Sequence, residues 1–104
     1  METITAAQLQ LLLKEQPDLF LIDVREPIEH EDFNIGGQLM PLGELMQHAN
    51  DIPKDKPVVV YCHHGVRSVI AIQKLEAKLG FSNLINLQGG THAWEIELNK
   101  TSTA

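Results

Sequence analysis

The sequence predicts an α/β fold with a central parallel sheet flanked by helices on both faces. Three short, continuous apolar runs, at residues 19–22, 58–61 and 84–87, are typical of strands that are buried on both sides. Segments with helical patterns lie before, between and after these runs. Such an alternation favours parallel strands joined by crossover helices. A chain of 104 residues suffices for one domain, which we place over residues 1–104.

The first half of the chain opens with a helix predicted over residues 6–15. Thr5 and Gln8 have the spacing of a capping box, and Pro17 ends the helix. The strand at 19–22 comes next and runs into an Asp-Val-Arg sequence. Further helical segments are then expected at 26–33, where a proline opens the helix, and at 42–49.

The second half of the chain contains the strongest signals. The β-branched run at 58–61 predicts a strand, and Gly80 is the expected C-cap of a helix over 68–79. After the strand at 84–87, Gly89 and Gly90 form a turn that lets the final helix pack closely. That helix is expected at 91–98, followed by a frayed polar tail at 99–104.

Composition narrows the classes of partner. The formal net charge is −6, which argues against nucleic acid and anionic membranes as main partners. Cys62 is the single cysteine, so no internal disulfide can form, which suits a reducing compartment. The N-terminus lacks the basic, apolar pattern of a signal peptide, and no apolar run has the length of a membrane span. We therefore expect a cytoplasmic protein.

The segment after the strand at 58–61 carries the candidate chemistry. Cys62 leaves the strand, and a helix follows after a short loop; the segment comprises Cys62, His63, His64, Gly65, Val66, Arg67 and Ser68. A tight loop before a helix turns successive backbone N–H groups inward and forms a cradle for an anion. The helix dipole adds positive potential. Cys62 at the base of this cradle is expected to be a stabilised thiolate and a nucleophile.

Other polar residues at the strand ends have supporting roles in this prediction. Asp23 and Arg25 follow the strand at 19–22 and are expected to brace the loop through hydrogen bonds, a structural role rather than direct chemistry. Glu26 and Glu29 are interpreted as a solvated acidic face. Trp94 is expected in the core or the pocket wall.

The two loop histidines allow two interpretations. His63 and His64 either tune the electrostatics of Cys62 or are exposed loop side chains. No metal site is expected at Cys62, His63 and His64, because adjacent residues on a tight loop rarely converge on one ion. No cofactor is expected either, since Gly89-Gly90 lacks the spacing of a dinucleotide fingerprint.

Three motifs, in order, resemble the rhodanese family. Cys62–Ser68 reads CHHGVRS, against a family pattern of Cys, two variable residues, Gly, one variable residue, Arg and Ser. LIDVREP at 21–27 is similar to the family's first-strand signature, and GGTHAW at 89–94 to its last-helix signature. The chain departs from the pattern at Phe33–Gly37 on the pocket rim, where many members have Gly-His-Ile. It also has histidines rather than Lys or Arg at positions 63 and 64.

The resemblance implies a sulfurtransferase with a rhodanese-like fold. Cys62 would take sulfur from a donor such as thiosulfate, hold it as a persulfide, and pass it to cyanide or a thiol. The loop N–H groups from His63 to Ser68 would hold the persulfide, and Arg67 would help to neutralise the donor. Because the chain has no second cysteine, the acceptor must come from outside and could be a sulfur-accepting protein.

Two other functions remain open at this point. A phosphatase or arsenate reductase places Cys and Arg around a loop one residue longer than the four residues found here. A non-catalytic rhodanese module used for binding typically lacks the cysteine, whereas this chain keeps Cys62 and Arg67.

Overall fold

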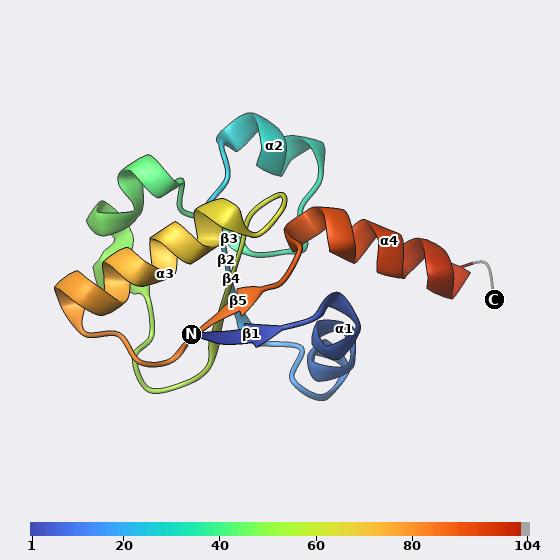
Figure 1. Ribbon diagram of the computed structural model, residues 1–104, viewed down its shortest axis with the longest axis horizontal. Coiled ribbons are helices and arrows are strands. Elements are labelled where there is room, and N and C mark those ends of the chain that lie inside the picture. The colour runs from blue at the N-terminus through green and yellow to red at the C-terminus, as the bar shows by residue number, and fades with distance from the viewer. Residues whose placement is uncertain (103–104) are drawn as a thin grey trace.

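The computed structural model describes residues 1–102, which form one parallel sheet with the strand order β1-β5-β4-β2-β3 (Figure 1). All four strand pairings are parallel. The predicted fold class, a parallel sheet with helices on both faces, is confirmed. In chain order the elements are β1 (Glu2–Ile4), α1 (Ala6–Glu15), β2 (Phe20–Asp23), α2 (Pro27–Asp32), β3 (Gln38–Leu39), η1 (Leu42–Asp51), β4 (Val58–Tyr61), α3 (Val66–Leu79), β5 (Leu84–Leu87) and α4 (Gly90–Ser102).

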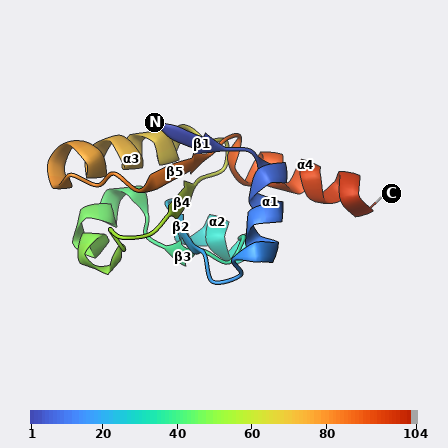
Figure 2. The same ribbon diagram turned by 90° about the horizontal axis from the view of Figure 1, so that it is seen from below.

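The sheet has a separate apolar core on each face. Alternate residues of β4 point to opposite sides: Val58 and Val60 join the core under α3 and η1, while Val59 and Tyr61 join the core under α1. Figures 1 and 2 show α1 and α3 on opposite sides of the strands. All four residues of β4 are fully buried, which explains why the strand has no polar alternation in the sequence.

Helix boundaries follow the predicted signals closely. In the capping box of α1, Gln8 N donates to Thr5 Oγ1 at 3.1 Å and Thr5 N donates to Gln8 Oε1 at 2.9 Å. Gly65 and Gly80 flank α3, and both adopt left-handed backbone conformations. α3 begins at Val66, two residues before the predicted start, so Arg67 lies in the first helical turn rather than in the loop.

Two strands are absent from the prediction. β1 and β3 are the edge strands of the sheet, with three and two residues respectively. β1 reads Glu-Thr-Ile and is mostly exposed, so it has no apolar run that would mark it. The sequence therefore indicated only the three central strands, whose two faces are both covered.

Two helices differ from their predicted form. The segment predicted as a helix at 42–49 is a 3-10 helix that continues to Asp51, and Glu44 N donates to Pro41 O three residues back at 2.8 Å. Gly43 and Asn50 are weak helix formers that disfavour a regular α-helix there.

α4 runs to Ser102, so the predicted frayed tail is helical through that residue, and positions 103–104 lie outside the described residues. Within residues 1–102, no helix combines the length and apolarity needed to span a bilayer.

Candidate active site

Cys62 lies at the carboxyl end of β4 with its sulfur turned into the loop that follows. Gly65 N donates to Sγ at 3.1 Å and Ser68 N donates to it at 3.4 Å. Gly65 has φ +96°, a conformation that directs its N–H back toward the sulfur. Cys62 is only 1% exposed. Two of the backbone N–H groups of the predicted segment, those of Gly65 and Ser68, therefore donate to the sulfur near the start of α3.

The side chains of Ser68 and Asn86 form a buried polar pair next to the Cys62 sulfur. Ser68 Oγ is 3.5 Å from Cys62 Sγ and donates to Asn86 Oδ1 at 2.5 Å. Asn86 is buried in β5 opposite Val60, on the sheet face that also carries Cys62. Asn86 was not among the predicted site residues, although a polar residue inside an apolar strand is a signal of an internal hydrogen bond.

The first turn of α4 holds the loop from the other side. Thr91 N donates to Cys62 O at 2.9 Å and His92 N donates to His63 O at 3.0 Å. Gly90 makes this approach possible, because a Cβ at that position would overlap the carbonyl groups of Cys62 and His63. The predicted role of Gly89-Gly90, a turn that lets the final helix pack closely, is confirmed.

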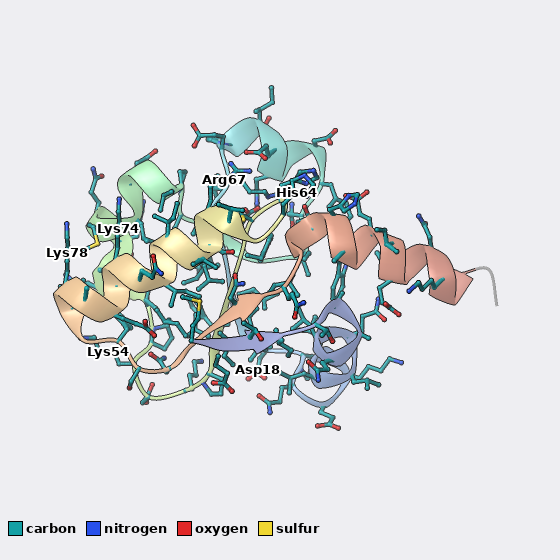
Figure 3. All side chains as sticks on the ribbon, viewed as in Figure 1. Asp18, Lys54, His64, Arg67, Lys74 and Lys78 are labelled. Atoms are coloured by element: carbon teal, nitrogen blue, oxygen red, sulfur yellow. The ribbon has the colours of Figure 1, made fainter. Side chains whose placement is uncertain are left out.

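Arg67 forms an ion pair with a carboxylate that was not among the predicted site residues. Its guanidinium binds both carboxylate oxygens of Glu29 on α2, at 2.7 and 2.8 Å. Hydrogen bonds from Arg67 lower the pKa of Glu29 to about 2. The interpretation of Glu29 as part of a solvated acidic face is wrong, because Arg67 of α3 binds its carboxylate and the side chain is only 30% exposed. Figure 3 shows Arg67 at the start of α3, facing α2.

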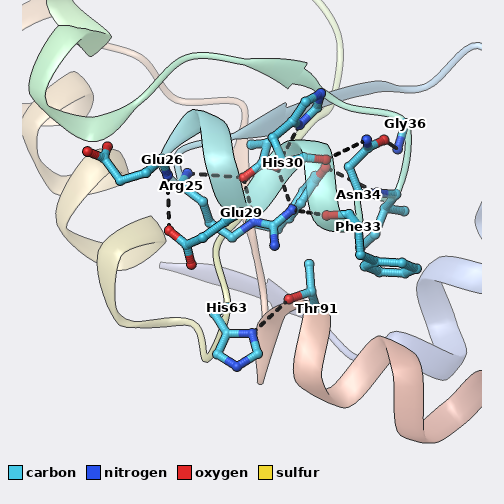
Figure 4. A network of polar contacts seen from close by, with 12 residues as sticks. Arg25, Glu26, Glu29, His30, Phe33, Asn34, Gly36, His63 and Thr91 are labelled. Carbon is cyan, nitrogen blue, oxygen red and sulfur yellow. Dashed lines mark hydrogen bonds and ion pairs between the residues drawn. The ribbon is translucent and has the colours of Figure 1, made fainter.

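Asp23 and Arg25 form the centre of a buried polar network (Figure 4). Arg25 donates to Asp23 through its backbone N, Nε and a terminal nitrogen, at 3.0, 2.9 and 2.8 Å. His30 Nδ1 lies 2.9 Å from Asp23, and Arg25 also donates to Phe33 O at 2.5 Å. Burial disfavours the charged carboxylate, but the hydrogen bonds from Arg25 and His30 outweigh it and lower the pKa of Asp23. The network ties the end of β2 to α2, beside the loop rather than directly to it.

A cavity of about 240 Å³ lies between α2, the loop and the first turns of α4, and Arg25, Glu29, His63 and Thr91 are among the residues lining it. Cys62, which is buried, is not one of them. Phe33 also lines it. The segment Asn34–Gly37, expected at the pocket rim, turns over Tyr61, where Ile35 N donates to the phenol oxygen at 3.3 Å.

Three histidine rings gather where the loop meets α4. The ring centroids of His63 and His64 are 4.1 Å apart, those of His64 and His92 5.1 Å, and those of His63 and His92 5.9 Å. Desolvation, followed by repulsion from His63, His92 and Arg67, lowers the pKa of His64. Only the two adjacent loop histidines were among the predicted site residues. His92 joins them because the first turn of α4 is hydrogen-bonded to the loop.

Comparison with known proteins supports the assignment of the fold. The family model described as "Rhodanese-like domain" matches residues 5–97. The chain belongs to the rhodanese-like family. Among relatives of this rhodanese-like domain, the thiosulfate sulfurtransferase GlpE of Coxiella burnetii is 32% identical over 84 residues, covering 80% of this chain and 78% of that protein. Members named as sulfurtransferases therefore share most of the domain.

Two further comparisons bear on the extent of the match. A Bacillus subtilis protein, YqhL, is 48% identical over 75 residues, and the match covers 71% of this chain and 59% of YqhL. The crystal structure of a rhodanese-related protein from Thermoplasma volcanium superposes with a TM-score of 0.80 at 32% identity, covering 93% of each chain. This rhodanese-like domain thus matches a solved structure over nearly its full length.

Proposed function

We propose that this chain is a sulfurtransferase that moves sulfane sulfur from a donor such as thiosulfate to cyanide or a thiol through a persulfide on Cys62. The observation that carries the proposal is the pair of backbone donors on the sulfur, Gly65 N at 3.1 Å and Ser68 N at 3.4 Å, in a loop that opens into α3. Relatives named as sulfurtransferases support the class of reaction.

The reaction consists of two displacements at sulfur. The Cys62 thiolate attacks the outer sulfur of thiosulfate, the S–S bond of the donor breaks, and its electron pair leaves with sulfite. Cys62 then carries a persulfide, whose charge the loop N–H groups stabilise. Cyanide attacks the outer persulfide sulfur, thiocyanate leaves, and the bonding pair returns to Cys62 as thiolate. A thiolate acceptor takes the sulfur in the same way.

Arg67 has a defined place in this proposal. Its guanidinium presents two parallel N–H donors to Glu29, and the same fork matches two oxygens of an anionic donor. We assign Arg67 to donor binding by exchange of Glu29 for the donor. Glu29→Gln weakens the competing contact and should lower the KM for thiosulfate, whereas Arg67→Ala should raise it. Unchanged KM values in both variants would remove Arg67 from donor binding.

Intact mass measurement tests the persulfide directly. Incubation with thiosulfate should add the mass of one sulfur atom to the wild-type chain, and a reductant should remove it. Cys62→Ser should fold, as circular dichroism would show, and gain no mass. Turnover of thiosulfate by Cys62→Ser would contradict the proposal.

The alternatives give different results in the same set of assays. A phosphatase would hydrolyse an aryl phosphate in a Cys62-dependent way, whereas the proposal expects negligible hydrolysis. The loop has four residues between Cys62 and Arg67, one fewer than in the related phosphatases, which favours sulfur over a phosphate group. A binding module would be inactive in both the thiosulfate:cyanide assay and the phosphatase assay, and would gain no mass.

A further inference from the structure

The histidine cluster, defined as His63, His64 and His92, combines ligands from two separate segments. His63 and His64 belong to the loop after β4, and His92 lies in the first turn of α4. One nitrogen from each ring lies within 4.8 Å of the nitrogens of the other two. Figure 3 shows His64 beside the start of α4. We propose that this cluster binds a divalent transition-metal ion such as Zn²⁺ at the mouth of the active-site loop.

The distances are close to those of a metal site. Zinc–nitrogen bonds of about 2.0–2.1 Å in a tetrahedral arrangement place ligand nitrogens about 3.3 Å apart. The separations within the cluster therefore need to shorten by at most about 1.5 Å. His64 and His92 are exposed, so their rings can rotate by this amount without displacing packed side chains. The ion can thus be bound without movement of the backbone.

The backbone under the cluster is already fixed. His92 N donates to His63 O at 3.0 Å, which locks the two ligand-bearing segments together. The His63 ring is oriented by a hydrogen bond between Nδ1 and Thr91 Oγ1, at 3.1 Å (Figure 4). This contact leaves Nε2 of His63 for the ion. A histidine ligand whose second ring nitrogen is bound by a neighbour is the usual arrangement in metal sites.

The donor set selects the class of ion. Imidazole nitrogens suit zinc, copper, iron and nickel, whereas magnesium and calcium prefer oxygen. Three nitrogens leave one position of a tetrahedral ion open to water or another small ligand. Cys62 is not part of the site, because its sulfur is buried and faces Gly65 and Ser68. The earlier expectation against a metal rested on Cys62, His63 and His64 alone, and His92 supplies the ligand that this set lacked.

Zinc binding by competition with a chromogenic zinc chelator tests the proposal, with a phosphine in place of thiol reductants. The wild-type chain should bind one Zn²⁺. His92→Gln should weaken binding at least about tenfold, since loss of an outer-shell partner alone costs about 10–100-fold. His48→Gln, on η1 and outside the cluster, is the matched control and should retain wild-type affinity. Cys62→Ser should also retain it.

Three results of the same zinc titrations would contradict the proposed metal site. Absence of zinc binding, or equal affinities for wild type and His92→Gln, would overturn it. Loss of affinity in Cys62→Ser would assign the ion to the thiolate instead, and Co²⁺ would then show a sulfur-to-cobalt charge-transfer band that the proposal does not expect. These measurements need no sulfur donor, so their outcome is independent of the proposed sulfur transfer.

Discussion

Replacement of Asp23 by Asn tests the buried polar network through stability. Asp23 is fully buried, and the side chain of Arg25 is only 4% exposed. Asn keeps one oxygen for the backbone N and Nε of Arg25. Its amide group, however, replaces the oxygen that faces the terminal nitrogen of Arg25 and the ring of His30. The variant therefore leaves the guanidinium buried without the carboxylate that is hydrogen-bonded to it.

The expected cost of Asp23→Asn is about 3–5 kcal/mol, the range for removing one partner of a buried ion pair. Since a domain of this size has a total stability of about 5–15 kcal/mol, the loss is a large part of the whole. At about 4 °C or more per kcal/mol, the Tm should fall by at least about 12 °C. Urea and thermal denaturation followed by circular dichroism give both quantities.

Glu29→Gln is the matched control, because it breaks the same kind of bidentate pair at a more exposed position. The side chains of Arg67 and Glu29 are 35% and 30% exposed, so the cost should not exceed about 1 kcal/mol. The double variant Asp23→Asn/Arg25→Met removes both charges and should recover part of the loss. Equal, small losses for Asp23→Asn and Glu29→Gln would refute the argument that burial decides the cost.

Two further predictions concern Tyr61 and Gly90. Desolvation raises the pKa of Tyr61 to about 12. Because Tyr61 is the only tyrosine in the sequence, the absorbance of tyrosinate reports its titration directly. The titration midpoint should be about 12 in the folded chain and about 10 in urea. Because the pKa of Tyr61 is higher in the folded than in the unfolded state, its contribution to the free energy of unfolding is intact below about pH 10 and is lost as the pH rises toward 12. A tyrosinate midpoint near 10 in the folded chain would contradict the burial argument. Gly90→Ala should destabilise the domain by more than about 1 kcal/mol, because the new Cβ meets the carbonyls of Cys62 and His63 at a positive φ. Gly43→Ala, with open space around the new Cβ, should be neutral within about 1 kcal/mol in the same urea titration, and equal effects would count against the close approach.

Sequence patterns predicted the central strands and the long helix because each of these elements has a clear local signal: a continuous apolar run for a buried strand, and a C-cap glycine for the helix. β4 is apolar at every position since both of its faces are covered, and Gly80 marks the end of α3 through its left-handed conformation. β1 lies at the sheet edge with mostly exposed side chains, so it has no apolar run that would predict a strand. The sheet centre could be predicted, and the edges could not.

In the candidate site, too, some residues could be predicted from the sequence and others could not. Cys62 and its loop are contiguous in the sequence, so their chemistry could be predicted together. The partners of that loop come from elsewhere: Glu29 from α2, Asn86 from β5 and His92 from α4. Their meeting depends on strand order and helix packing, which no local pattern specifies.

The hydrogen bonds from α4 to the loop have a consequence for folding. Thr91 and His92, which fix the carbonyls of Cys62 and His63, lie about thirty residues after the cysteine. Until α4 docks on the sheet, these two carbonyl groups lack their backbone donors. The loop that holds the thiol is therefore completed by an element that is distant in the sequence, and loosening of α4 should also loosen the loop.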